Sequence, residues 1–216
     1  MERSSMERRR WLLLLSPLLI IGAGHLAARL TGAIWGVWSW IPVTLVYWTL
    51  LAAMIFSNGG RAAFAKWLRP SQGAWGWRVF PLLSATLFLP VFIPNFRLLN
   101  SLPILAYWLA LAAIDPWLEE GYWRGLLMDA ADGWPGWLVV VYSTFCFALS
   151  HPLILGVNVR ALSGLPGFIG TCFTGIIWAV AYRKTRSLRW PIFSHTIVDL
   201  VSLSVLVFLN RVVLPT

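Results

Sequence analysis

Charged residues are scarce in this chain of 216 residues. They make up 12% of it, and only eight are acidic, whereas a soluble domain carries about 25% charged residues. Hydrophobic residues make up 59%, and the mean hydropathy is +0.73. These values exclude an ordinary soluble domain and predict an all-α fold, a polytopic helical bundle integral to a membrane.

Cysteine is scarce too, and low-complexity tracts and internal repeats are not evident. Cys146 and Cys172 both lie in apolar runs, which predicts buried apolar side chains rather than a disulfide or a metal-binding pair. A cleavable signal peptide is not indicated either, because the apolar run after Arg8, Arg9 and Arg10 continues as a spanning segment. The chain is therefore expected to form one membrane domain.

Long apolar runs are abundant, and seven of them reach or approach the roughly 20 residues that a helix needs to cross a bilayer. The third is short and carries Pro81, Pro90 and Pro94, which predicts a kinked or re-entrant segment and leaves six to eight spans. The segments are 11–30, 34–56, 79–94, 103–128, 136–156, 164–182 and 190–212. Residues 1–100 then hold the N-terminal spans and a basic cytoplasmic loop, and residues 101–210 form the rest of the bundle.

The net charge of +9 is best explained by topology. Lys and Arg fall in short clusters between apolar runs, so we expect no nucleic-acid partner. With the N-terminus in the cytoplasm, 12 basic residues fall on the inner side and 4 on the outer side, and cytoplasmic loops carry such an excess. The inner set is Arg3, Arg8, Arg9, Arg10, Arg61, Lys66, Arg69, Arg78, Arg183, Lys184, Arg186 and Arg189, and the outer set is Arg29, Arg97, Arg160 and Arg211. An odd number of spans then places the C-terminus outside.

Ionisable residues inside the spans concentrate in three segments of the C-terminal half. They are Asp115, Glu119, Glu120 and Arg124 in the fourth segment, His151 in the fifth, and His195 and Asp199 in the seventh. Charged groups cost about 2.5–3.5 kcal/mol each at a helix centre, and those that occur usually face a bundle interior or a water cavity and mark function. We therefore expect the three segments to pack around one site.

Spacing divides the two adjacent glutamates. Glu120 and Arg124 stand at i and i+4, so they can pair on one helix face. A purely structural ion pair is the alternative reading of these two residues. Glu119 points about 100° away from Glu120 and has no such partner. We expect Glu119 to face a cavity and act as a base.

The two histidines indicate a reaction in which Glu119 would act as the base. A carboxylate and two imidazoles around one water suit hydrolysis, in which Glu119 takes a proton while His151 or His195 holds the water or stabilises an oxyanion. Asp199, one turn after His195, is expected to orient its ring. Glu119, His151 and His195 also form a known zinc ligand set. The residues leave open whether a divalent metal or a metal-free base activates the water.

Three further sequence signals are given structural interpretations. Asp115 precedes Pro116 and is expected to break or cap a helix. Ser150 and Ser194 each precede a histidine, but adjacent helix residues point about 100° apart, which argues against a serine nucleophile. Gly121 and the glycine four residues later predict a close helix contact.

Three motifs in order resemble the CPBP family of intramembrane proteases, also called the Abi or type II CAAX prenyl endopeptidase family. They are Glu119-Glu120 with Arg124, Phe147 with His151, and His195 with Asp199. In each motif the last residue stands four positions after the residue named before it. The resemblance covers roughly residues 100–205. It implies that residues 101–210 form a catalytic helical core with a site inside the bilayer.

The resemblance also implies roles. Glu119 and His151 would activate the water with Glu120 beside them, His195 and Asp199 would form the oxyanion site, and Arg124 and Phe147 would support it. Eukaryotic-type members usually have Asn where this chain has Asp199. An ionised aspartate cannot donate a hydrogen bond to an oxyanion, so Asp199 would have to be protonated or orient His195.

The implied activity is hydrolysis of a peptide bond in a membrane-anchored protein or peptide: a prenylated C-terminus, a sorting tail or a precursor peptide. The expected location is the lipid bilayer, which is the inner membrane if the source is bacterial. Two alternatives are a small transporter with a proton relay and a non-catalytic scaffold or immunity protein of the same fold. If the helices were straight, Glu119, His151 and His195 would lie at different depths in the bilayer. A shared site would be ruled out if Glu119 lay more than about 10 Å from both histidine side chains.

Overall fold

The computed structural model describes residues 2–212, and side chains from Met6 onward. The chain is 84% helical, and the described residues contain no strand. The prediction of an all-α membrane bundle is confirmed. The side chain of Arg3, expected on the inner side, lies outside the described side chains.

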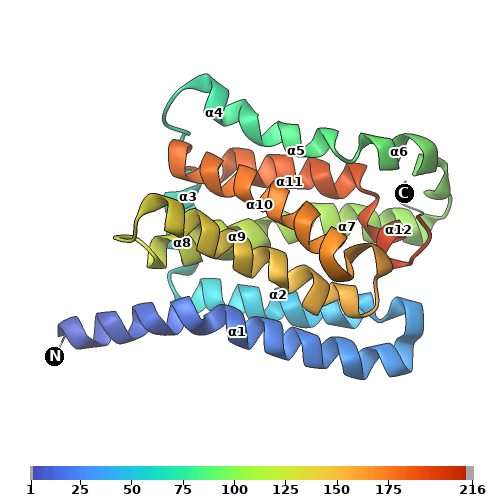
Figure 1. Cartoon of the computed structure of the whole chain (residues 1–216), viewed down its shortest axis with the longest axis horizontal. Coiled ribbons are helices and arrows are strands. Elements are labelled where there is room, and N and C mark those ends of the chain that lie inside the picture. The colour runs from blue at the N-terminus through green and yellow to red at the C-terminus, as the bar shows by residue number, and fades with distance from the viewer. Residues whose placement is uncertain (1, 213–216) are drawn as a thin grey trace.

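The N-terminal part is a pair of long helices. Helix α1 (Glu2–Trp35) and helix α2 (Trp40–Ser57) are joined by a short 3₁₀ turn, η1 (Gly36–Trp38), and pack against each other. Figure 1 shows them along one edge of the bundle. Helix α3 (Gly60–Trp67) follows at the end where α2 finishes.

The proline-rich third segment is broken, as its sequence predicts. It consists of α4 (Trp75–Val79), the 3₁₀ turn η2 (Phe80–Leu82), α5 (Leu83–Thr86) and α6 (Leu89–Asn95). The two halves, 75–86 and 89–98, meet at an angle of 47°. Proline removes a backbone donor and clashes with the preceding turn, which explains breaks of this kind.

The fourth segment changes its helix type in the middle. Helix α7 (Leu102–Glu119) continues into a π-helix, η4 (Glu120–Leu126), and then into α8 (Leu127–Ala130). Every residue of the π-helix is buried. π turns are rare overall but frequent at functional sites. This segment therefore points to the position of a functional site.

The remaining helices complete the bundle around α7. Helices α9 (Gly136–Leu153) and α10 (Gly164–Thr185) pack side by side. Helix α11 (Arg189–Val201) packs against α7 and is followed by α12 (Ser204–Phe208). The seventh predicted segment is therefore present as two shorter helices, separated at Leu203, whose φ is 55°.

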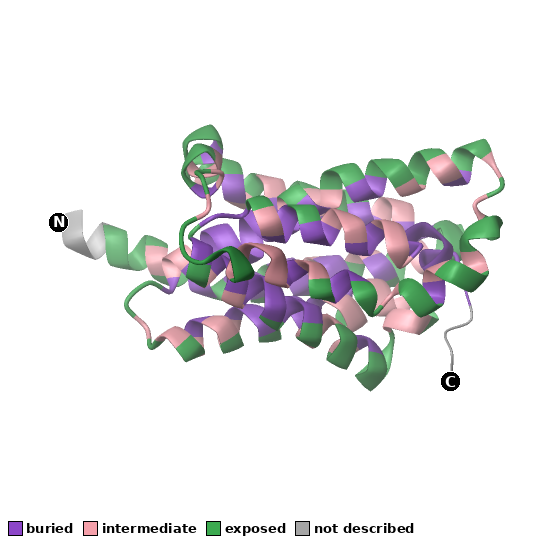
Figure 2. Cartoon of the chain, turned by 90° about the horizontal axis from the view of Figure 1, so that it is seen from above, coloured by how far each residue is buried: buried purple, intermediate pink, exposed green. Residues whose placement is uncertain are grey.

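The distribution of buried and exposed residues is that of a membrane protein. Figure 2 shows buried residues along the centre of the bundle and exposed ones on its outer faces. Large apolar side chains such as Leu18, Ile34 and Leu102 are 70–79% exposed, whereas Glu119, Glu120 and Arg124 are buried. Within residues 2–212, five helices are long and apolar enough to cross a membrane, and the bent pair makes a sixth if it forms one span.

Two glycines of the π-helix, Gly121 and Gly125, allow close contact with α2 and α3. A Cβ atom on Gly121 would lie 3.1 Å from side-chain atoms of Ile55 and Phe64. A Cβ atom on Gly125 would lie only 2.7 Å from the ring of Trp67. The predicted close contact is therefore observed, and it fixes the site helix against the N-terminal half.

Replacing Gly125 by alanine should destabilise the protein by about 1–3 kcal/mol, because the buried Trp67 ring must move. Thermal unfolding in detergent measures the effect. The matched control is Gly22→Ala in α1, where a Cβ atom meets nothing within 4 Å; alanine there should be neutral or stabilising. Equal melting temperatures for Gly125→Ala and the wild type would contradict the close packing.

Candidate active site

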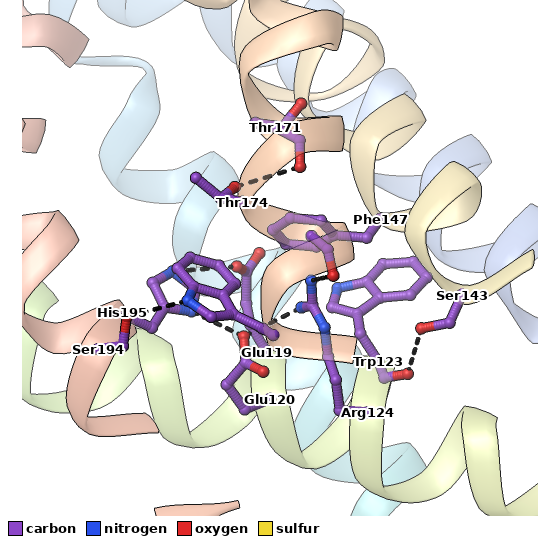
Figure 3. Close-up of polar contacts among 12 residues, drawn as sticks. Glu119, Glu120, Trp123, Arg124, Ser143, Phe147, Thr171, Thr174, Ser194 and His195 are labelled. Carbon is purple, nitrogen blue, oxygen red and sulfur yellow. Dashed lines mark hydrogen bonds and ion pairs between the residues drawn. The ribbon is translucent and has the colours of Figure 1, made fainter. Parts of the chain in front are cut away.

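One cavity of about 260 Å³ lies in the bundle, lined by α2, α7, α9, α10, α11 and α12 and by the break between α5 and α6. Its lining includes most of the predicted site residues. The ionisable side chains that line it are Tyr47, Asp115, Glu119, His151, His195 and Asp199. Figure 3 shows Glu119, Glu120, Arg124 and His195 grouped together.

The Glu119 side chain lines the cavity, and its two carboxylate oxygens have different surroundings. Its Oε1 accepts a hydrogen bond of 2.7 Å from the hydroxyl of Tyr47, which in turn accepts one of 2.9 Å from Nε1 of Trp123. Its Oε2 is buried and has no hydrogen-bond partner among the described residues. The carboxylate is thus held on one side and free on the other, as a general base requires.

The Glu120 carboxylate contacts two neighbouring side chains. Its Oε1 lies 3.0 Å from Nη1 of Arg124 and 3.0 Å from Nδ1 of His195. The ion pair with Arg124 is fully buried on both sides. In the structure Glu120 is paired with Arg124 and Glu119 lines the cavity, whereas the role of Glu119 as a base stays a prediction.

Arg124 is held in place by an aromatic wall. Its guanidinium carbon lies 4.0 Å from the centre of the Phe147 ring and 5.3 Å from that of Trp178. Arginine is attracted to aromatic faces when it is desolvated. Phe147 therefore supports the site through the cation that neutralises Glu120.

The His195 ring is held by stacking on Trp178, and Trp178 is in turn held through Ser194. It stacks on Trp178 with ring centres 4.1 Å apart and planes inclined by 20°. Nε1 of Trp178 donates to Ser194 Oγ at 3.1 Å, and this hydroxyl donates to the Pro81 carbonyl at 2.6 Å. Ser194 thus serves the packing of the ring, in agreement with the expectation that it is not a nucleophile.

The other ring nitrogen of His195 is surrounded by carboxylates. Nε2 lies 3.6 Å from Oε2 of Glu119, 3.8 Å from Oδ1 of Asp199 and 4.0 Å from Oδ2 of Asp115. These distances exceed normal hydrogen-bond lengths. Asp199 was expected to orient the ring, but Glu120 makes the hydrogen bond that does so.

His151 reaches the same cavity from α9. Its Nδ1 lies 3.0 Å from the carbonyl oxygen of Phe147, and its ring packs edge-on against the Phe147 ring at 4.7 Å. A carbonyl oxygen only accepts, so Nδ1 carries the proton and Nε2 keeps a lone pair. Ser150 donates to the same carbonyl at 2.7 Å.

Asp115 is where the sequence interpretation was wrong. It was expected to break or cap a helix, but α7 continues through Asp115 and Pro116 to Glu119. Its side chain lines the cavity, and Oδ1 accepts a hydrogen bond from Nε1 of Trp48. An Asp-Pro pair resembles a helix end in sequence, yet here the helix continues through it, with Pro116 buried in the bundle and Ile114 and Trp117 exposed on its outside.

The sequence-predicted residues meet at one site. Glu119 and His195 approach to 3.6 Å, so the difference in depth expected from straight helices does not separate them. Three supporting residues were missed: Tyr47, Trp123 and Trp178. A tyrosine or tryptophan in an apolar run looks like a residue at the membrane interface, so the sequence held no signal to single them out.

The predicted metal ligands are only partly brought together. Among residues 2–212, the acids and histidines whose ligand atoms all lie within 4.8 Å of one another are Asp115, His195 and Asp199. This group shares only His195 with the expected set of Glu119, His151 and His195. The role of that expected set stays a prediction.

The chain matches a known protein family over part of its length. Residues 100–201 match the family described as type II CAAX prenyl endopeptidase Rce1-like. The matched range contains all three sequence motifs and most of the cavity lining. Comparisons with curated proteins and with solved structures give no match.

Replacing Arg124 by methionine should destabilise the protein by about 3–5 kcal/mol, because the Glu120 carboxylate would remain buried without its cation. Adding Glu120→Gln should recover much of this loss. A double-mutant cycle followed by thermal unfolding in detergent measures both effects. Arg61→Met, at an exposed position on α3, is the control; a loss for Arg124→Met no larger than for the control would contradict the buried ion pair.

Proposed function

Because residues 100–201 form a domain of the type II CAAX prenyl endopeptidase Rce1-like family, we propose that this chain is an intramembrane endopeptidase in which Glu119 activates the attacking water. The observation that carries the proposal is the Glu119 carboxylate. One oxygen is held by Tyr47, and the other lies 3.6 Å from Nε2 of His195 without a hydrogen-bond partner among the described residues.

The first step uses two acceptors. A water in the cavity gives one hydrogen bond to Oε2 of Glu119 and one to Nε2 of His151, whose lone pair is free because Nδ1 is bound to a carbonyl. Glu119 then takes a proton from the water, and the water oxygen forms a bond to the carbonyl carbon of the scissile peptide. The carbonyl oxygen becomes an oxyanion.

The second step returns the proton. The bond between the carbonyl carbon and the peptide nitrogen breaks, and Glu119 passes its proton to the departing amine. During both steps the oxyanion needs a positive charge or a donor nearby. Nε2 of His195 lies 3.6 Å from Oε2 of Glu119, so positive charge on the His195 ring would stabilise an oxyanion formed beside the base.

The substrate we propose is a membrane-anchored protein or peptide. The cavity walls are largely apolar, with Phe88, Val91, Leu111, Leu155 and Phe208 among the lining residues. A site of this kind favours a peptide segment that is itself lipid-bound, such as a prenylated C-terminus, a sorting tail or a precursor peptide. Proteomics of membrane fractions, comparing wild type with Glu119→Ala, identifies termini that need the active enzyme.

Glu119→Gln should lower the cleavage rate by about 10²–10⁴-fold, because the amide cannot accept the water proton. The substitution keeps the size of the side chain and an oxygen for the Tyr47 bond, so thermal stability should change little. The assay is cleavage of a lipid-anchored peptide in proteoliposomes. Glu7→Gln, at an exposed glutamate of α1, should cleave like wild type. Full activity in Glu119→Gln would eliminate the proposed base, and a wild type that releases no new termini would favour a scaffold.

We also propose that the N-terminus is cytoplasmic, because the basic clusters fall on that side in the sequence. Gln72, between α3 and α4, and Ser163, before α10, are exposed and lie on opposite sides in this orientation. Single cysteines at these positions, with Cys146 and Cys172 replaced by alanine, should react with an impermeant thiol reagent from opposite sides of the membrane. Labelling of position 72 from outside the cell would reverse the topology.

A further inference from the structure

We propose that the cavity has a lateral entrance between α6 and the first half of α10, and that Gly170 sets its size. The entrance is defined by four residues that line the cavity: Phe88, Val91, Pro166 and Gly170. Its occupant is the apolar segment of a membrane-anchored peptide substrate. The entrance serves the cleavage proposed above, so this role rests on the proposed function.

The cavity extends well beyond the ionisable residues. Gly170 lines it near the start of α10, whereas the His195 ring is stacked on Trp178, further along the same helix. Trp178 lies eight positions after Gly170, which corresponds to about 12 Å along a helix. An extended peptide covers this distance with about four residues. This arm of the cavity is therefore long enough for the stretch of substrate next to the scissile bond.

Gly170 is the glycine of α10 that neither the backbone nor the packing explains. The glycine at the start of the helix has a φ of 67°. A Cβ atom on Gly167 would lie 2.4 Å from the Leu162 carbonyl oxygen, and one on Gly175 would lie 3.0 Å from Phe147. A Cβ atom on Gly170 would meet no described atom within 4 Å. Because glycine weakens a helix relative to alanine, a group that enters this space explains the residue better than the fold does.

The same stretch of α10 reaches the outer surface of the bundle. Pro166 and Gly170 line the cavity and are exposed. Next to them Leu165 and Ile169 are 67% and 57% exposed and lie outside the cavity lining. Helix α10 is long and apolar enough to cross a membrane. The cavity thus comes to the surface beside apolar side chains that suit contact with lipid.

The opposite wall of the entrance is the broken third segment. Helix α10 packs against its first half, which consists of α4, η2 and α5, and the segment then bends by 47° before α6. Figure 1 shows α6 and the start of α10 at the same end of the bundle. Phe88 at the bend and Val91 in α6 line the cavity. Because of the bend, no straight continuation of α5 covers the first half of α10.

Two threonines suit this arm of the cavity to a polypeptide rather than a lipid chain. Thr171 and Thr174 line the cavity, and their hydroxyls donate to carbonyls of their own helix at 2.8 and 3.2 Å. Each hydroxyl oxygen keeps a lone pair that can accept a backbone N–H of a bound peptide. An acyl chain has no donor for these oxygens. The occupant is therefore the peptide segment that adjoins the scissile bond.

Substitutions at position 170 test the entrance by the size of the side chain. In the proteoliposome cleavage assay we expect Gly170→Leu and Gly170→Phe to raise KM progressively, with kcat/KM at least tenfold lower for phenylalanine and kcat largely kept. The matched control is Gly22→Phe in α1, at an exposed glycine outside the cavity where a Cβ atom also meets no described atom within 4 Å. It should cleave like wild type. An unchanged kcat/KM in Gly170→Phe would overturn the entrance.

A binding measurement separates the entrance from the chemistry. Glu119→Gln protein is reconstituted with a palmitoylated leucine–alanine peptide that carries one photoreactive leucine, and crosslinks are mapped by mass spectrometry. We expect crosslinks to α6 and to residues 166–174, reduced at least tenfold by adding Gly170→Phe and unchanged by adding Gly22→Phe. Excess peptide without the palmitoyl group should compete, whereas excess palmitic acid should not.

Each outcome of the crosslinking has a distinct meaning. Equal yields with and without Gly170→Phe would overturn the entrance, whatever the wild type cleaves. Competition by palmitic acid alone would overturn the peptide segment as the occupant. Crosslinks at the expected residues, in a protein whose wild type releases no new termini, would keep the entrance and reject the proposed cleavage.

Discussion

The site depends on one buried carboxylate, that of Glu120. Its Oε1 joins Arg124 on the same helix to His195 on α11. Without Arg124 the charge of Glu120 would be costly inside the bundle, and without Glu120 the His195 ring would lose the bond that sets its tautomer. The adjacent Glu119 is free for chemistry because Glu120 has taken these structural duties.

Aromatic side chains do much of the positioning around that carboxylate. Trp178 stacks on His195, and Phe147 contacts both Arg124 and His151. From the N-terminal half, Tyr47 holds Glu119 and connects it to the rest of the bundle. The family match begins only at residue 100, yet the working site includes this contribution from α2.

The sequence located the ionisable residues of the site better than the residues that support them. Glu119, His151 and His195 were recognisable because ionisable groups are rare and costly in apolar segments. Tyr47 and Trp178 were not, because aromatic residues are common in such segments and their hydrogen bonds depend on tertiary packing. Asp115 was misinterpreted because the helix-breaking tendency of Asp-Pro gave way to packing. The fold was predictable in its helices, whereas the π-helix at Glu120–Leu126 had no periodic signal.

That π-helix makes the site sensitive to chain length. A π turn contains one residue more than an α turn, so the helix after it is rotated by about 100° relative to an uninterrupted α-helix. Glu119 lies before the turn and faces the cavity, while Gly125 lies within it and faces Trp67. Deleting a single residue between them would let the helix relax to α geometry and turn one of the two faces away from its partner. The surplus residue is thus an insertion on which the orientation of Glu119 and the packing of the helix both depend.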